Sequence, residues 1–389
     1  MERLIADNAK NGEVIFPYIG GEEVNSSPVH SSHRYVINLG VQGEEQCRRE
    51  WPDLMAILEK KVKPERDKLR DNSDGKQYKK FWWRFGRPSP ALFMAIEGRN
   101  HVLVNSQVST HICFSIIQAD QVYGHTLYVY PYATSAHLAA MQSSAHAIWG
   151  AFQGSSLGDG IRYTAASSFE TFPFPVALLD SIASEPANAA QRHRLEAVGE
   201  RYHQFRAELM VSNNEGLTRT YNRFHDPAET SSELLELRRL HGEMDQAVLV
   251  AYSWSDVPTN CGFGLDYLDI EDDIRLPDAL QERIDSGELF FWDANDALNF
   301  QGQLQAHGAI TGRRKLPWRY RWPDAVRDDV LARLLALNAE RYEEEMSIGL
   351  HSKAGKKADG AGSGGKRRGR PPQSSQLDSG TAAQIGLAL

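Results

Sequence analysis

The composition of the chain changes at about residue 178, and this change constrains the fold more than any other feature. Before it, short stretches rich in β-branched and aromatic residues are separated by Gly, Pro, Asn and Ser. They predict strands at residues 14–18, 35–39, 92–96, 111–117 and 126–130. Helices are expected at about 51–70 and from an N-cap at Thr134 or Ser135 to Phe152. Residues 1–178 are therefore predicted to form a mixed, β-rich α+β domain.

After residue 178, apolar residues recur every three or four positions, which is the spacing of one helix face. This pattern begins at Leu195, Val198 and Tyr202. It predicts helices at about 187–211, 234–251 and 326–337. We expect residues 179–350 to form a helical C-terminal domain.

No feature of the chain indicates a membrane or secreted protein. It has 389 residues, of which 41% are hydrophobic, enough for two domains with substantial cores. No run of 18 apolar residues occurs, and the N-terminus lacks a hydrophobic signal region. The three cysteines have neither disulfide nor zinc spacing, so we expect a cytoplasmic protein.

The net charge of −8 is unevenly distributed. Residues 353–389 carry seven Lys or Arg and two Asp, so that residues 1–352 carry −13. Within that acidic part, residues 60–87 hold eleven Lys or Arg against four Asp or Glu. A basic face, rather than a basic total, is what phosphate contact requires. Four cations lie among aromatic residues and are candidates for DNA phosphate contact, the alternative being a solvated face with ordinary charge pairs: Lys79, Lys80, Arg84 and Arg87.

The segment 154–175 (GSSLGDGIRYTAASSFETFPFP) combines a flexible bend with polar recognition groups. Its glycines allow close backbone approach to a ligand, while Asp159 is an acceptor and Arg162 a forked donor. Such a loop can read base edges, with Ser155 and Ser156 nearby. The alternative is an ordinary turn between strands.

This segment resembles the end of the target recognition domain in MmeI-like DNA methyltransferases, where an Arg-Tyr-Ser/Thr step leads into a Phe-Pro-Phe/Trp-Pro close. Other blocks resemble the same family in the same order. They include residues 11–23 (NGEVIFPYIGGEE), 34–40 (RYVINLG), 51–70, 79–88 (KKFWWRFGRP), 141–149 (MQSSAHAIW), 217–222, 237–254 and 322–340. The resemblance spans roughly residues 11–346.

The resemblance implies an enzyme of restriction-modification or phage defence that transfers a methyl group from S-adenosylmethionine to adenine N6. This chain lacks the Asn-Pro-Pro-aromatic loop that such chemistry needs on a flipped base. Its only Gly-x-Gly-x-x-Gly match, at residues 360–365, follows no predicted strand. We therefore expect it to be inactive alone, to hold no cofactor, and to bind double-stranded DNA beside a separately encoded or missing methyltransferase domain. A stand-alone DNA-binding module and a structural subunit of a defence complex are the alternatives.

Other possible sites are rejected on sequence grounds. Asp53, Glu59 and Lys61 have a nuclease-like spacing, but the apolar residues between them predict a helix rather than the required strands. Five histidines between His101 and His146 show no zinc-ligand spacing. The acidic residues at 266–273 lack the calcium-loop pattern and predict a solvated turn.

Residues 351–389 are rich in Gly, Ser, Lys, Ala and Pro, and they predict a disordered basic tail. It contains KRRGRPP at 366–372, in which Arg368 and Arg370 have the spacing of an AT-hook that enters a narrow minor groove. A solvated basic tail is the alternative.

Overall fold

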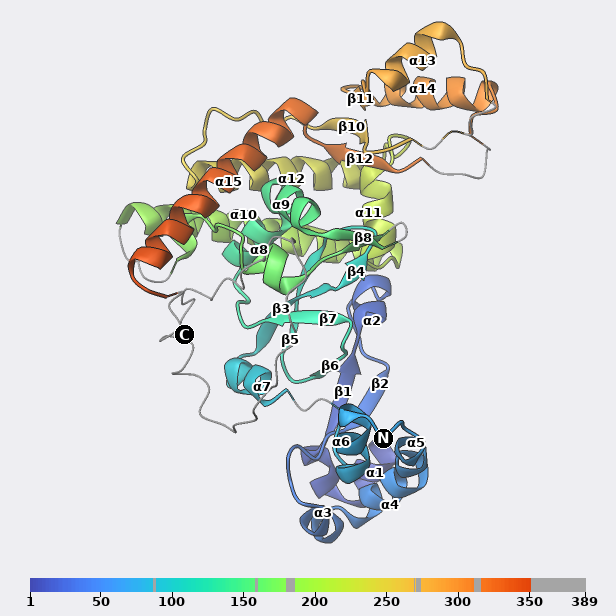
Figure 1. The fold of residues 1–389 in the computed structure, drawn as a ribbon, viewed down its shortest axis with the longest axis vertical. Helices are drawn as coiled ribbons and strands as arrows, with labels where there is room; N and C mark the ends of the chain where they lie inside the picture. Colours follow the sequence, from blue (N-terminus) through green and yellow to red (C-terminus); the bar gives the residue numbers. More distant parts are fainter. Residues whose placement is uncertain are drawn as a thin grey trace, which may run out of the picture. The chain divides into compact units, whose positions relative to one another are not determined.

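The computed structural model describes residues 1–86, 89–157, 160–179, 186–268, 270, 274–310 and 316–350. Its elements fall into two compact units, which Figure 1 shows in sequence colours. Unit 1 comprises Met1–Ser106 with Ser115–Ala133, and unit 2 comprises Gln107–Phe114 with the chain from Thr134 onward. Small mixed sheets accompany many helices, so the α+β class is confirmed. No helix of the described ranges is long and apolar enough to cross a membrane.

Unit 1 contains two three-stranded sheets. In the first, β1 (Ile15–Ile19) lies between antiparallel β2 (Arg34–Ile37) and parallel β6 (Val122–Tyr123). In the second, β3 (His101–Ser106) lies between β5 (Phe114–Gln118) and antiparallel β7 (Leu127–Tyr130). The strands predicted at 14–18, 35–39 and 126–130 are confirmed as β1, β2 and β7, and the one predicted at 111–117 overlaps β5.

The helices of unit 1 gather mainly before and between these strands. They are α1 (Glu2–Asp7), the 3-10 turn η1 (Ala9–Glu13), α2 (Gly21–Ser26), α3 (Glu44–Glu50), α4 (Pro52–Lys61), α5 (Lys63–Asp67), α6 (Ser73–Lys80) and α7 (Pro90–Ile96). One core joins α3 and α4 to the aromatic run after α6 through Cys47, Trp51, Leu54, Trp82 and Trp83. The indole N–H of Trp83 donates to the Gln42 carbonyl at 3.1 Å, which fixes this run against the core.

Three sequence predictions differ from the structure. Residues 92–96, predicted as a strand, lie in α7, because Pro90 begins a helix well and Ala, Leu and Met continue it. The helix expected at 51–70 is broken between α4 and α5, next to Pro64, which has no N–H to donate. The helix from Thr134 to Phe152 is broken at extended Ser143, although Thr134 is confirmed as its N-cap.

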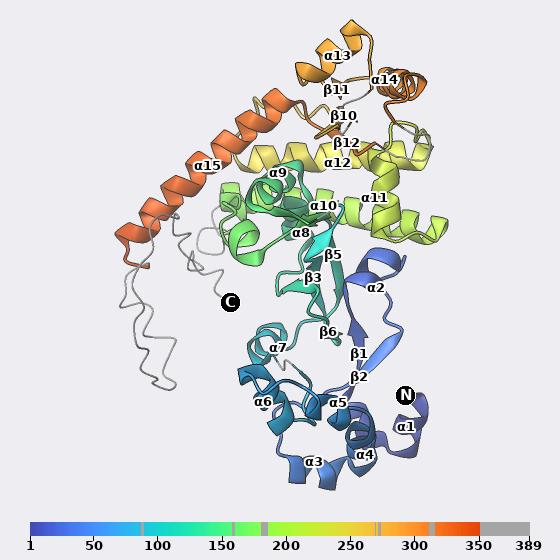
Figure 2. The same cartoon turned by 45° about the vertical axis from the view of Figure 1, so that its right-hand side comes forward.

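Unit 2 is built around long helices. These are α8 (Ser135–Gln142), α9 (Ser144–Gln153), α10 (Pro186–Asn213), α11 (Leu217–His225), α12 (Ser232–Ala251) and α15 (Asp324–Ser347). They confirm the helices predicted at 187–211, 234–251 and 326–337. Figure 2, a second view, shows α10 and α12 running side by side.

Helices α8 and α10 touch backbone to backbone at Gly199. A Cβ atom on this residue would lie 2.0 Å from the carbonyl oxygen of Ser135. The first turn of α8 donates to carboxylates of α10: the N–H groups of Ser135 and Ala136 to Glu196 at 3.0 and 2.9 Å, and the Ser135 hydroxyl to Glu200 at 2.5 Å. Carboxylates satisfy the unpaired N–H groups at a helix N-terminus, so this packing also caps α8.

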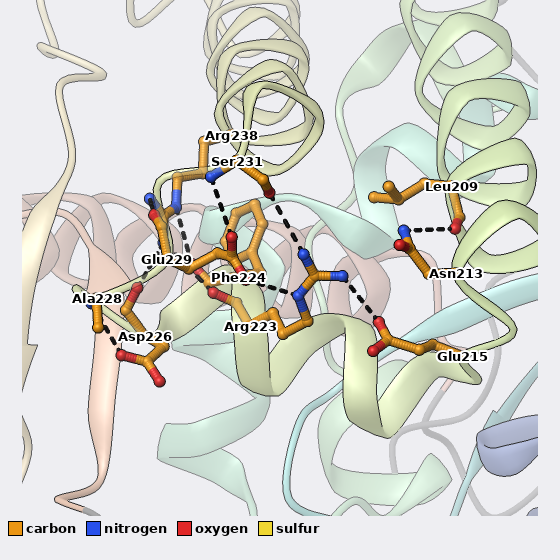
Figure 3. A network of polar contacts seen from close by, with 10 residues as sticks. All are labelled: Leu209, Asn213, Glu215, Arg223, Phe224, Asp226, Ala228, Glu229, Ser231 and Arg238. Carbon is orange, nitrogen blue, oxygen red and sulfur yellow. Dashed lines mark hydrogen bonds and ion pairs between the residues drawn. The ribbon is translucent and has the colours of Figure 1, made fainter.

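A polar network fixes the corner between α11 and α12 (Figure 3). Arg223 bonds the carboxylates of Glu215 at 3.1 Å and Glu229 at 2.6 Å. Arg238 donates to four backbone carbonyls at and beyond the end of α11, those of Arg223, Phe224, Asp226 and Glu229. Because the last carbonyls of a helix have no partner within it, Arg238 acts as a C-terminal cap.

Two small sheets complete unit 2. The antiparallel sheet β11 (Phe290–Phe291), β10 (Gly262–Leu265) and β12 (Trp318–Arg321) packs with α13 (Asp278–Asp285) and α14 (Ala294–Ala306) around its own core. The sequence analysis predicted only helices here. The other sheet joins β4 (Val108–Ser109), β9 (Gly160–Arg162) and β8 (Ser155–Leu157), and the turns η2 (Ala165–Phe169) and η3 (Val176–Leu178) follow it.

Candidate nucleic-acid interface

The candidate readout residues lie on an antiparallel pair of strands in unit 2. β8 and β9 pair Ser155 with Arg162, and β9 pairs on its other side with β4, where Val108 lies opposite Arg162. The structure therefore brings Ser155 and Arg162 together as direct neighbours across the sheet. Ser156 pairs with Ile161 through the backbone. Asp159 lies outside the described residues.

Strand alternation directs Arg162 away from the protein interior. Ile161 is half-buried and lines a cavity, Arg162 is exposed, and Tyr163 is only 2% exposed. Successive side chains of a strand point to opposite faces, so the neighbours of Arg162 anchor the strand while Arg162 itself faces solvent. No carboxylate of the described residues lies within ion-pair distance of its guanidinium. The side chain is therefore available to a ligand.

Tyr163 anchors the hairpin to a fully buried histidine. Its hydroxyl lies 3.1 Å from Nε2 of His146, and Nδ1 of His146 lies 2.8 Å from the Met141 carbonyl. A carbonyl only accepts, so the neutral ring donates from Nδ1 and accepts from the Tyr163 hydroxyl at Nε2. Burial lowers the pKa of His146 to about 4, which keeps the ring neutral at physiological pH.

The aromatic-proline run that follows is core rather than ligand surface. Phe172 packs against His146 and Phe174 with ring centroids 4.6 and 4.9 Å apart. The Pro173 carbonyl accepts a hydrogen bond from the Tyr252 hydroxyl at 2.8 Å. The run thereby holds the end of the hairpin segment against α9 and α12.

The candidate phosphate-binding residues belong to unit 1, and two of them already have partners. Lys79 forms an ion pair with Asp71 at 2.6 Å. Arg84 donates to the Gln42 carbonyl at 3.2 Å, and its guanidinium lies 4.3 Å from the ring centre of Phe81. Lys80 is exposed and has no acidic partner among the described residues, and Arg87 lies outside them. Other exposed cations of this segment, without an ion pair in the described part, are Lys60, Lys61, Arg70 and Lys76.

The nuclease-like residues do not form a metal site. Asp53, Glu59 and Lys61 all lie on α4, as the sequence analysis predicted. Asp53 accepts from the Asn11 amide at 2.5 Å, and Glu59 pairs with Arg48 at 3.1 Å. Across the described ranges, no three His, Cys, Asp or Glu side chains are grouped closely enough to hold a metal ion.

A cavity in unit 2, with both apolar and polar residues in its lining, was not predicted from the sequence. It measures about 140 Å³ and its lining includes His111, His225, His241 and Arg319. One signal was present in the sequence: the alternation Trp-Arg-Tyr-Arg-Trp at 318–322 predicts a strand with its arginines on one face. The histidines come from distant segments, so nothing local indicated that they meet.

Comparison with known proteins confirms the resemblance for the first part of the chain. Residues 1–176 match the family model "MmeI, target recognition domain". They include the hairpin with Arg162 and end before α10. These residues are therefore similar to the target recognition domain of MmeI.

The other comparisons add less. A search of curated proteins gave no match. Among solved structures, the chain is similar to the Type IIL restriction-modification enzyme MmeI in complex with DNA, at 20% identity and a TM-score of 0.48. The match covers 79% of this chain and 33% of that one, so this chain spans about a third of the enzyme's length. Neither value is high enough to transfer the role of any residue.

Proposed function

We propose that this chain recognises a specific sequence in double-stranded DNA, as the recognition part of a restriction-modification enzyme. The observation that carries the proposal is the family match over residues 1–176, which includes a hairpin that presents an exposed, unpaired arginine. Arginine binds the major-groove edge of guanine through two hydrogen bonds. Arg162 is our candidate for this contact, with Ser155 opposite it on β8. Ser156 and Asp159 remain further candidates from the sequence.

The phosphate contacts would come from unit 1. Of the three candidates that the structure describes, Lys80 is the best placed. Lys79 and Arg84 would first have to leave the Asp71 carboxylate and the Gln42 carbonyl, whereas Lys80 is exposed and contacts only the Phe81 ring, at 5.1 Å. Contacts of this kind position the protein and carry no sequence information. Arg368 and Arg370, which lie outside the described residues, would add a minor-groove contact.

We further propose that the complete enzyme methylates adenine N6 with S-adenosylmethionine, in restriction-modification or phage defence in the cytoplasm. The resemblance supports this reaction. Because the catalytic motifs are missing from this sequence, our proposal places the reaction in another part of the enzyme. Transfer of labelled methyl groups to DNA by the purified chain alone would contradict that assignment.

The test of DNA recognition is selection from a randomised duplex library with the purified chain. We expect one sequence to be enriched, and Arg162→Ala to lose preference at one position by about 1–3 kcal/mol while its binding to other duplexes remains. Arg201→Ala is the matched control, because Arg201 is an exposed arginine on α10 that pairs with Glu243. It should leave every preference unchanged.

Two results would overturn these assignments separately. If the wild-type chain enriches no sequence, the proposed function is wrong. If folded Arg162→Ala keeps the wild-type preference at every position, the hairpin is scaffold and the readout residues lie elsewhere.

A further inference from the structure

The cavity of unit 2 lies where seven stretches of the chain meet. Ala147 and Ile148 of α9 and Ile161 of β9 form an apolar wall. Residues of α11, α12 and β12, together with His111, Gln142 and Asp266, form much of the rest. The corner that Arg238 caps holds His225 at the end of α11, and thereby presents it to the cavity. A polar group removed from water is destabilising unless it is hydrogen-bonded, so polar groups at a cavity that lack a partner indicate where a ligand could bind.

Arg319 is the cavity's unpaired cation. Its guanidinium donates to the Thr110 carbonyl at 3.2 Å and to the Trp318 carbonyl at 3.5 Å. Burial lowers its pKa, but an arginine remains charged in proteins. No carboxylate of the described residues lies within ion-pair distance of it. The other two cavity arginines, Arg321 and Arg327, both pair with Asp266 and Asp324.

A fully buried arginine in the same unit has more of its N–H donors hydrogen-bonded. Arg206 is 1% exposed and donates to Gln142 Oε1, the Tyr221 hydroxyl and the Phe114 carbonyl at 3.2, 3.0 and 2.7 Å. Arg319 has five donor N–H groups and uses fewer of them, at longer distances. Its remaining donors are free to bind an anion.

Two stacked histidines offer further hydrogen-bonding groups. The rings of His111 and His225 lie 4.9 Å apart. Nδ1 of His225 accepts from the Tyr320 N–H at 3.0 Å, so the neutral ring carries its hydrogen on Nε2, which has no partner in the described part. Nδ1 of His241 is also buried without a partner. Burial first, and then the charge of Arg319, lowers the pKa of His111 to about 4, so a bound anion would relieve an unfavourable field.

The volume limits the size of the ligand. Pockets for drug-sized molecules measure roughly 300–1,000 Å³, whereas a cavity of about 150 Å³ holds one benzene molecule. At about 140 Å³, this cavity is too small for S-adenosylmethionine or a dinucleotide. It suits a single small anion.

We propose that this cavity binds one phosphate or carboxylate group, with room inside it for no more of the ligand than about one six-membered ring. The oxygens would bind Arg319 and Nε2–H of His225, and the rest of the ligand inside the cavity would lie against the apolar wall. Such a group could come from a free metabolite or from the backbone of bound DNA. The proposal goes beyond DNA recognition and does not depend on it.

The test uses the full chain with inorganic phosphate and, separately, benzoate, each compared with chloride at equal ionic strength. We expect a saturable rise in the melting temperature with at least one of them, because a ligand that binds only the folded state stabilises it. Arg319→Gln should weaken this binding by about tenfold or more, since a charge-assisted contact is lost. Arg333→Gln is the control, because Arg333 pairs with Asp256 and Asp329 and does not line the cavity.

A second measurement separates binding from a change in folding. Saturating anion should raise the pKa of His111, followed by NMR, in the wild type but not in Arg319→Gln. If Arg319→Gln does not fold, Arg319→Lys keeps the charge and should show weakened binding. Competition by duplex DNA would identify the DNA backbone as the source of the anion, and simultaneous binding would identify a free ligand. The proposal is wrong if neither probe binds saturably to the wild type, or if folded Arg319→Gln binds both as the wild type does.

Discussion

The hairpin of unit 2 and the aromatic-basic segment of unit 1 (residues 78–86) both place cations next to aromatic residues. The two regions differ in whether those cations are bound by the protein itself. In the hairpin, Tyr163 is buried and Arg162 is left without a partner. In residues 78–86, the aromatic rings are themselves the partners: Arg84 lies over Phe81, and Lys63 over Trp82 at 5.0 Å. A cation is therefore available to a ligand only to the extent that it is not already bound by other groups of the same protein.

The largest expected effect is the loss of stability in acid, and this loss should be greater in unit 2 than in unit 1. Among the described residues, the buried histidines are His111, His137, His146 and His241, all in unit 2. The pKa of His146 is about 4 in the folded protein against 6.5 for a free side chain, so unfolding takes up a proton between these values. The contribution of neutral His146 to the free energy of unfolding is complete above pH 6.5. It is lost as the pH falls toward 4, by on the order of 3 kcal/mol.

Urea unfolding at pH 7, 6 and 5, followed by hydrogen exchange of peptides from each unit, would check this response. Unit 2 should lose stability first. Burial raises the pKa of Asp245, which opposes part of the loss, because its proton is held more tightly in the folded state. Equal losses in both units would contradict this prediction, since unit 1 would then contain a titrating group with an equal effect on stability.

The next effect tests the anchor of the hairpin. Tyr163→Phe removes the hydroxyl that donates to His146 and leaves a buried ring nitrogen without a partner, which should destabilise unit 2 by about 1–3 kcal/mol. The same urea experiment at pH 7 measures it. Phe152→Leu is a suitable control, because Phe152 is exposed on α9. An unchanged free energy of unfolding would mean that water replaces the hydroxyl.

Arg84→Ala should destabilise unit 1 by about 1–2 kcal/mol, because it removes a hydrogen bond to Gln42 and a cation–π contact. Arg162→Ala should change the free energy of unfolding by less than about 0.5 kcal/mol, as exposed substitutions usually do. Urea denaturation of both variants measures the two changes. If Arg162→Ala lost as much stability as Arg84→Ala, Arg162 would also be held by contacts within the protein.

The smallest effect concerns Lys79. Its ion pair with Asp71 is worth only about 0.2–1 kcal/mol, because the acid is largely exposed. Lys80→Ala should weaken binding to every duplex more than Lys79→Ala does, and should reduce the salt dependence by about one counterion. Salt titrations of duplex affinity measure both. A larger loss for Lys79→Ala would show that its pair with Asp71 opens on DNA.

Local patterns were enough to predict much of the fold. The periodicity that begins at Leu195 predicted α10. The strands β8 and β9 around Arg162 were not predicted, since that segment was expected to be a flexible bend. The run at 92–96 was misassigned because five apolar residues have no period that distinguishes a strand from a helix.

The sites were less predictable. The role of Arg162 in base readout stays a prediction from its segment. The pairing of Lys79 and Arg84 depends on Asp71 and Gln42, whose proximity is a result of folding. The cavity could not be predicted for the same reason, because His111, His225 and Arg319 come from three distant segments of the sequence. Tertiary contacts between such segments leave no local pattern in the sequence.

The close contact at Gly199 limits how unit 2 can move. If α8 slid along α10 by one helical turn, about 5.4 Å, a residue with a side chain such as Leu195 or His203 would face the Ser135 carbonyl. The hydrogen bonds to Glu196 and Glu200 would be lost in the same step. Sliding between these helices is therefore opposed in both directions, and we expect α8 and α10 to move together when a ligand binds.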